Sequence, residues 1–155
     1  MEDAFELNNV IKYGLLITLG VVIWVIGAHL VVPNPCSPVH ELGPLICFNL
    51  LEIFGIYLGM GATKRQTGQL FFKEGLKTGM GIATVYGLCS CVFFLGFLMV
   101  LGSGAMCPKP GMERFSLWQM AAFAFAAQFL FAIFLGLIYS TIIAFLLATR
   151  RSQAG

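Results

Sequence analysis

Four long blocks of mainly apolar residues constrain this chain more than any other feature. The blocks run over residues 13–32, 42–62, 76–102 and 118–148, and nearly all charged residues lie outside them. A helix needs about 20 apolar residues to cross the hydrocarbon core of a bilayer, so each block is long enough. An open sheet is excluded, because backbone groups in lipid must be satisfied within a helix or a closed barrel. The pattern predicts an all-α integral membrane four-helix bundle, with residues 1–155 as a single transmembrane domain.

The composition excludes two other classes of protein. Charged residues make up 10% of the chain and the mean hydropathy is +0.90, whereas a soluble domain carries about 25% charged residues. The net charge of +2 is small, and no basic cluster with interleaved aromatic residues indicates nucleic-acid binding. Residues 1–6 are acidic and lack the basic region that begins a cleavable signal peptide, so we expect the first span to remain in the mature protein.

The basic residues are distributed unevenly between the two ends of the predicted bundle. Seven of the nine fall at one end, namely Lys12, Lys64, Arg65, Lys73, Lys77, Arg150 and Arg151, and two fall at the other, namely Lys109 and Arg114. Basic residues near spans stay on the cytoplasmic side, so this asymmetry predicts that both termini are cytoplasmic. We therefore expect a multi-pass membrane protein.

Glu52 lies inside the second apolar block, where an ionised carboxylate costs roughly 2.5 kcal/mol or more. Such a residue must be neutral, paired or directed at a cavity. Asn49, Glu52, Ile56 and Gly59 are spaced so that they share one helix face, with Gly55 beside them. The two glycines are four residues apart, a spacing that lets another helix approach closely. The stripe is therefore predicted to face protein and not lipid.

Depth along the predicted spans offers partners for this stripe. At about 1.5 Å per residue, Glu52 is level with Gln128 and Asn49 is level with His29. One interpretation is a proton or cation site at Glu52. The other is a protonated Glu52 that bonds Gln128, Ser90 or a backbone carbonyl and holds helices together. Transporters usually carry several such groups and broken helices, which favours the second interpretation.

The histidines give little support for a metal site. His29 lies near one end of the first span, and His40 and Glu41 lie in the following loop. Their spacing matches no metal-binding motif, and metal sites usually have three or four ligands. We predict no metal and no cofactor.

The cysteines fall into two groups. Cys36 and Cys107 lie in the two predicted outer loops, which face an oxidising compartment, so we predict a disulfide between them. The bond requires Cα atoms about 4.4–6.8 Å apart. Cys89 and Cys91 lie within a span on different helix faces and do not form the Cys-x-x-Cys pair of thiol oxidoreductases.

Two short stretches resemble a known family. Phe72–Gly79 reads FKEGLKTG and Lys12–Gly14 reads KYG, and both are similar to a bacterial four-span membrane family of unknown function that is common in Bacteroidetes. The resemblance implies a four-span fold and a location in the bacterial inner membrane, and it transfers no catalytic residue. The first stretch also contains a second pair of packing glycines, Gly75 and Gly79. It forms either an interfacial segment or the polar start of the third span, with snorkelling lysines. Microsomal glutathione-transferase-like proteins share the four spans, but their Glu-Arg-Asn loop signature is absent here.

These features favour a non-enzymatic multi-pass membrane protein that acts through helix contacts. It would be an accessory or structural subunit of a membrane complex, or a homo-oligomer, with the lipid bilayer, other membrane subunits or itself as partners. The alternative is a small proton- or cation-linked transporter or channel that uses Glu52. An enzyme is disfavoured, because the sequence offers no nucleophile–base pair and no paired carboxylates.

Overall fold

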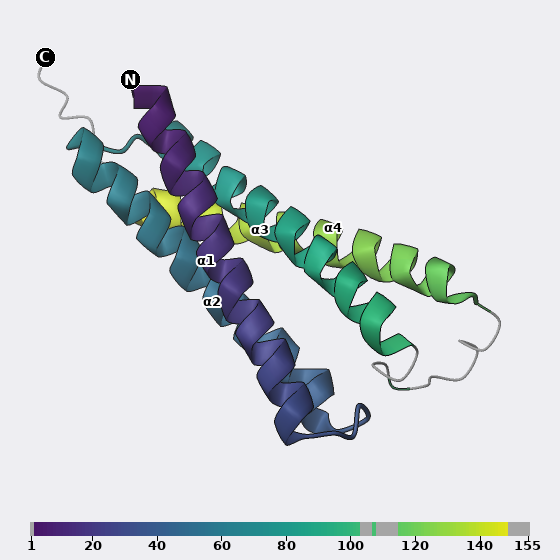
Figure 1. The fold of residues 1–155 in the computed structure, drawn as a ribbon. Coiled ribbons are helices and arrows are strands. Elements are labelled where there is room, and N and C mark those ends of the chain that lie inside the picture. The colour runs from purple at the N-terminus through teal and green to yellow at the C-terminus, as the bar shows by residue number, and fades with distance from the viewer. Residues whose placement is uncertain (1, 103–106, 108–114, 149–155) are drawn as a thin grey trace, which may run out of the picture.

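The computed structural model describes residues 2–102, 107 and 115–148, and within these ranges it contains four α-helices and no strand (Figure 1). The helices are α1 (Glu2–Val31), α2 (Pro38–Thr67), α3 (Phe72–Leu101) and α4 (Leu117–Leu147). Each is long and apolar enough to cross a membrane. The all-α architecture predicted from the apolar blocks is therefore confirmed. The basic residues at positions 109, 114, 150 and 151, which entered the charge asymmetry, lie outside the described residues.

The helices begin and end where local chemistry favours it, and they extend beyond the predicted spans mainly at their N-terminal ends. Pro38 is the first residue of α2. Proline suits this position, because the backbone N–H that it lacks would have no hydrogen-bond partner within the helix. Gly68 ends α2 with a left-handed backbone, φ +75°, which glycine adopts without strain. The Ser116 hydroxyl accepts from the Gln119 N–H at 3.3 Å, and the Gln119 amide oxygen accepts from the Ser116 N–H at 2.9 Å. This reciprocal pair caps the first turn of α4.

The start of α3 resolves the two alternatives for the stretch that contains Gly75 and Gly79. The Glu74 carboxylate accepts from the backbone N–H of Phe71 at 3.1 Å and so caps the helix. From Phe72 onward the chain is one unbroken helix. The stretch therefore forms the first turns of α3 and is not a separate segment.

One end of the bundle holds the start of α1, the end of α2, the start of α3 and the end of α4, and we call it the terminal end. Polar bonds tie the helices there: the Asn9 amide donates to Gln66 Oε1 at 2.7 Å, and the Lys64 ammonium donates to the Leu147 carbonyl at 2.7 Å. A cation at this position complements the negative end of the α4 dipole. We call the opposite end, which holds Cys36 and Cys107, the disulfide end.

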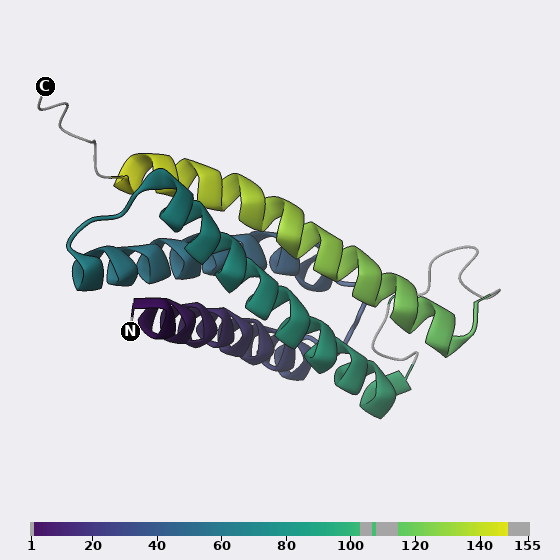
Figure 2. The same cartoon turned by 90° about the horizontal axis from the view of Figure 1, so that it is seen from above.

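The helices are close together at the terminal end and diverge toward the disulfide end. Figure 1 shows α1 and α2 running in one direction and α3 and α4 in another. In the view from above (Figure 2), α3 crosses between α1 and α4 and is in contact with both. The contact between α3 and α4 is the most extensive in the molecule. The bundle is therefore two helix pairs that are packed most closely at the terminal end, while ring contacts such as that of His29 with Phe97 still join them in the disulfide half.

Small residues explain the close packing between α3 and α4. Four pairs face one another at intervals of four residues along the antiparallel helices: Gly75 with Ala144, Gly79 with Ser140, Ala83 with Gly136, and Gly87 with Ala132. We call these pairs the small-residue ladder. A Cβ added at Gly79 or Gly136 would come closer than 3.0 Å to the facing side chain. The two backbones therefore approach as closely as small residues allow.

Glycines also bring the other helices together at the terminal end. A Cβ added at Gly55 would overlap Ile17 of α1, and one added at Gly59 would overlap Ile82 of α3. The surrounding side chains form a single buried core, whose fully buried large members include Ile17, Val21, Ile56, Met60, Ile82 and Tyr86. The terminal half is thus solidly filled.

Candidate functional site

A cavity of about 730 Å³ occupies the disulfide half of the bundle, between the two diverging helix pairs. Its walls are largely aromatic, with Trp24 from α1, Phe48 from α2, Phe94 and Phe97 from α3 and Phe125 from α4. These residues come from the parts of the helices that lie beyond the small-residue ladder. Large side chains at those positions line the space without filling it.

A second, smaller cavity of about 190 Å³ lies deeper in the bundle. Its polar lining groups are Asn49 and Glu52 of α2, Tyr86 of α3 and Gln128 of α4. Phe48 and Gln128 line both cavities, so the two spaces adjoin. Together they extend from the disulfide end to Glu52, near the middle of α2.

Glu52 is the acidic residue at the floor of this pair of cavities. Its side chain is 2% exposed, and within the described part of the chain its Oε1 atom has no hydrogen-bond partner. The same oxygen lies 3.2 Å from where a Cβ of Gly136 would be. Because Gly136 has no side chain, the carboxyl group lies directly against the backbone of α4. A buried polar atom without a partner carries a free-energy penalty, so a ligand or a proton is expected there.

The groups around Glu52 are polar but uncharged. Tyr86 of α3 and Gln128 of α4 line the smaller cavity together with Glu52. Glu52 and Gln128, one of the predicted pairs, both line the smaller cavity, and no hydrogen bond joins Glu52 Oε1 to Gln128. The Ser90 hydroxyl, which was a predicted bonding partner of Glu52, is buried and has no partner among the described residues.

Asn49 has a different partner from the one predicted. Its Oδ1 accepts from the Tyr139 hydroxyl at 2.5 Å, and its amide nitrogen donates to the Leu45 carbonyl. The predicted pairing with His29 is wrong, because α2 begins at Pro38 and not near Leu42. Asn49 therefore lies about 16 Å along α2 at 1.5 Å per residue, whereas His29 lies in the last turn of α1.

His29 lies instead at the wall of the large cavity, near the disulfide end. Its ring centroid is 6.3 Å from that of His40 and 5.7 Å from that of Phe97. His40 Nε2 lies 2.7 Å from the Val32 carbonyl oxygen, to which it donates when that nitrogen carries the proton. Within residues 2–102, 107 and 115–148, no group of three or more His, Cys, Asp or Glu side chains is placed to hold a metal ion.

All four glycines predicted to pack helices lie against other helices of this same chain. Gly55 and Gly59 lie against α1 and α3, while Gly75 and Gly79 belong to the small-residue ladder with α4. Sequence reasoning missed Gly136, which faces Ala83 and Glu52. A signal for it was present, because Ala132, Gly136, Ser140 and Ala144 repeat every four residues along α4. That repeat is the partner of the glycine pair on α3.

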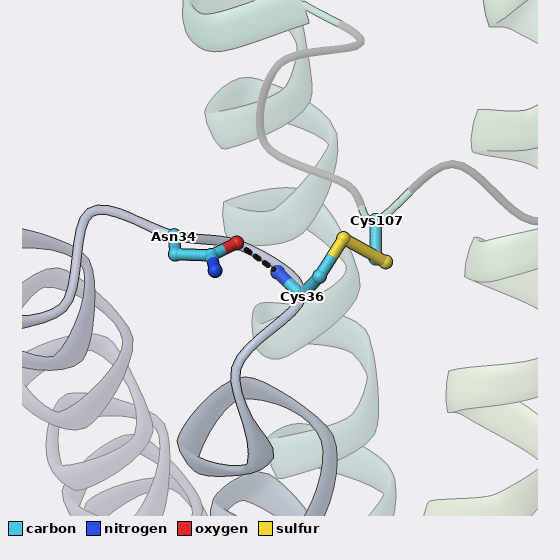
Figure 3. Close-up of a disulfide and its surroundings, with 3 residues drawn as sticks. All are labelled: Asn34, Cys36 and Cys107. Carbon is cyan, nitrogen blue, oxygen red and sulfur yellow. Dashed lines mark hydrogen bonds between the residues drawn. A yellow bond between two sulfur atoms is a disulfide. The ribbon is translucent and has the colours of Figure 1, made fainter.

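Cys36 and Cys107 are joined by a disulfide, with their Cα atoms 4.8 Å apart (Figure 3). The backbone N–H of Cys36 donates to the Asn34 side-chain oxygen at 3.0 Å, which fixes the turn before α2. Cys107 also lines the large cavity. The bond therefore links the α1–α2 connection to the chain that follows α3, at the wide end of the bundle. Cys47, Cys89 and Cys91 are free thiols.

Comparison with known proteins adds no relative. No protein family, no curated protein and no solved structure matches this chain.

Proposed function

We propose that this chain is a multi-pass membrane protein that carries a cation or a proton, with Glu52 as the binding group. The observation that supports this most directly is the buried Glu52 oxygen without a described partner, at the floor of two adjoining cavities. Such a carboxyl group in a bilayer is stable only with a proton or a cation beside it. Glu52 would release its proton when a cation binds, and it would take up a proton when the cation leaves.

The direction of access follows from the two ends of the molecule. The five basic residues that the structure describes, Lys12, Lys64, Arg65, Lys73 and Lys77, lie on the parts of α1, α2 and α3 nearest the terminal end. Basic residues favour the cytoplasmic side, and disulfides persist in an oxidising compartment. We therefore orient the disulfide end, with the cavities, toward the outside of the bacterial inner membrane.

The contrast between the two halves supports a transport cycle. The path to Glu52 begins at the disulfide end, while the packed core around Ile56, Met60 and Ile82 lies on its terminal side. Access from the other side would require the two helix pairs to separate at the terminal end and close at the disulfide end. This is alternating access by rocking of two halves about a central site.

The role as a subunit that acts through helix contacts is a second proposal, supported by a separate observation. α4 presents exposed aromatic side chains at Phe123, Phe131, Phe134 and Phe145. A partner helix or lipid could cover this face. The packing glycines do not add support, because their contacts are made within the chain. The mass of the protein in mild detergent tests this proposal: a monomer without a stoichiometric partner would contradict it.

A flux measurement tests the transport proposal. The purified protein is reconstituted into vesicles that enclose a pH-sensitive dye, and the rate of proton movement driven by a gradient of sodium, of potassium or of an organic ammonium ion is recorded. Glu52→Gln removes the charge and keeps the shape, so we expect at least a tenfold loss of the cation-dependent rate, about 1.4 kcal/mol. Glu74→Gln, the same change at the cap of α3, should leave the rate unchanged because Gln also caps that helix.

The structural interpretation of Glu52 predicts a different result. Glu52→Gln would then leave flux and stability unchanged, while Glu52→Ala and Gly59→Leu would lower the unfolding temperature. That combination would contradict the transport proposal.

A further inference from the structure

We propose that the ligand is a monovalent organic cation with a bulky apolar body, which lies in the large cavity with its charge directed at Glu52. The inference rests on the proposed function, since it takes Glu52 as the group that binds charge. It adds the chemical class of the ligand, which is set by the walls of the large cavity.

The aromatic walls favour a cation with an apolar body. Trp24, Phe48, Phe94, Phe97 and Phe125 line the cavity from all four helices. The face of an aromatic ring attracts a cation, most strongly where water is excluded. Contact between the same rings and the apolar surface of a ligand also favours binding, because that surface is removed from water. A molecule with both properties therefore matches this wall better than a simple ion does.

The charges around the cavities select against an anion. Among the described residues that line the two cavities, the acidic side chains are Glu52 and Glu41, and none is Lys or Arg. The nearest basic candidates are the imidazoles of His29 and His40, which stand together near the disulfide end of the large cavity. An anion that reached Glu52 would be repelled there and would find no compensating charge.

The oxygen ligands near Glu52 are too few for a divalent metal cation. Divalent cations such as calcium take six to eight oxygen ligands. At the floor of the cavity the described oxygens come from Glu52, Asn49, Tyr86 and Gln128, and Asn49 Oδ1 is already bonded to Tyr139. An organic ammonium, phosphonium or iminium group requires no such coordination shell.

The cavity volumes agree with this class. The large cavity, about 730 Å³, falls within the roughly 300–1,000 Å³ of sites for small organic molecules. The deeper cavity, about 190 Å³, has room for a small headgroup beside Glu52. A neutral apolar molecule of the same size would leave the buried carboxyl without a partner. A cation with an organic body uses both spaces.

Matched ions of opposite charge test the inference directly. Tetraphenylphosphonium and tetraphenylborate have nearly the same shape and carry +1 and −1. The chain has two tryptophans, and Trp118 is 69% exposed and lines neither of the two cavities. In a Trp118→Phe background, the fluorescence of Trp24 therefore reports on the large cavity alone. Each ion is titrated into the protein in mild detergent, with partition into empty micelles subtracted.

We expect tetraphenylphosphonium to quench Trp24 saturably and to bind at least tenfold more tightly than tetraphenylborate. Glu52→Gln should weaken the cation at least tenfold, and Glu74→Gln should leave its affinity unchanged. Phe48→Leu keeps an apolar side chain but removes the aromatic face, and should weaken the cation about threefold. Should Glu52→Gln fail to fold, the comparison of the two ions on the Trp118→Phe background still decides the charge preference.

Equal affinity for the two ions, or undiminished cation affinity in a folded Glu52→Gln protein, would overturn the inference. Its failure can be told apart from failure of the proposed function. Sodium- or potassium-driven proton flux that needs Glu52, without tetraphenylphosphonium binding, keeps the function and rejects this ligand class. Glu52-dependent binding without flux of any cation keeps the ligand class and rejects transport.

Discussion

The two halves of the α3–α4 helix pair differ in how they pack. In the terminal half, four pairs of small residues bring the backbones together, from Gly75–Ala144 to Gly87–Ala132. In the disulfide half, the same two helices contribute Phe94, Phe97 and Phe125 to a cavity wall. Side-chain size at the positions where α3 and α4 face each other therefore decides where this pair is close-packed and where it borders a cavity.

The change between the halves occurs at one step of the repeat. After Gly87 and Ala132, the same four-residue interval leads to Cys91 on α3 and Gln128 on α4, and both line the large cavity. Glu52 lies beside Gly136, one step inside the ladder. The candidate binding group thus lies just inside the boundary between the packed half and the hollow half. Each prediction below changes one half and compares it with the other.

The largest effect is expected from the disulfide, because the hollow half has no ladder to hold its helices together. Cys36→Ser combined with Cys107→Ser should lower the free energy of unfolding by about 2–4 kcal/mol, since the bond closes a long loop between residues 71 positions apart. Thermal unfolding in detergent, with and without a reductant, measures it. Mass mapping without reduction that found both residues as free thiols would contradict the bond itself.

The next effect compares two glycines of α3. A Cβ at Gly79 would come closer than 3.0 Å to Ser140, whereas at Gly96 no described atom lies within 4 Å. Gly79→Ala should therefore destabilise the protein by about 1–3 kcal/mol through overpacking. Gly96→Ala should be neutral or stabilise by up to about 1 kcal/mol, because alanine favours helix more than glycine does. Equal unfolding temperatures for the two variants would show that the ladder does not limit packing.

The difference between these glycines also shows what the sequence could predict. The lengths of the apolar blocks and the need to satisfy the backbone led to four helices, and helix periodicity placed Glu52 on a protein-facing stripe. The Asn49–His29 pairing failed because the start of α2 was placed four residues late, after Pro38 instead of at it. An error of one helical turn changes which side chains are level.

The cavity could not be predicted, because it depends on how far helices stand apart and not on any one residue. Phe48 and Phe94 are apolar residues of the kind found in any helix core, and their rings do contact each other, 6.0 Å between centroids. They line a cavity because the helix pairs diverge around them. The sequence predicted one side of the small-residue ladder, Gly75 and Gly79. Their partners on α4, Ala144 and Ser140, have no distinctive chemistry that would identify them. Pairing two helices requires knowledge of their relative register, which one chain's periodicity does not contain.

A smaller effect is expected at the boundary between the halves. The Tyr139 hydroxyl donates to Asn49 Oδ1 and so links α4 to α2 beside the deeper cavity. Tyr139→Phe should cost about 1 kcal/mol, because it removes one partly buried hydrogen bond and leaves the amide oxygen without its donor. Tyr57→Phe is the control, since the Tyr57 side chain is 50% exposed. Chemical or thermal unfolding in detergent compares the two, and equal stability would show that the Asn49 bond adds nothing.

The smallest effect concerns two serines of the same helix, and it runs against the usual expectation that buried polar residues matter more than exposed ones. Ser140 is fully buried in the ladder, and its hydroxyl has no hydrogen-bond partner among the described residues. Ser116 is exposed and caps the first turn of α4. Ser140→Ala should change the free energy of unfolding by less than about 0.5 kcal/mol or stabilise slightly, because it removes a buried hydroxyl that makes no bond. Ser116→Ala should cost about 1 kcal/mol through loss of the cap.

The sign of this pair distinguishes two explanations of the packed half. If close approach of small side chains holds α3 to α4, Ser140→Ala should leave the ladder unchanged, because alanine is small enough to face Gly79. If a hydrogen bond from the Ser140 hydroxyl were needed instead, Ser140→Ala would lower the free energy of unfolding more than Ser116→Ala does. Unfolding curves of both variants in one detergent decide between them, and a larger loss at position 140 would reject size as the property that separates the packed half from the hollow one.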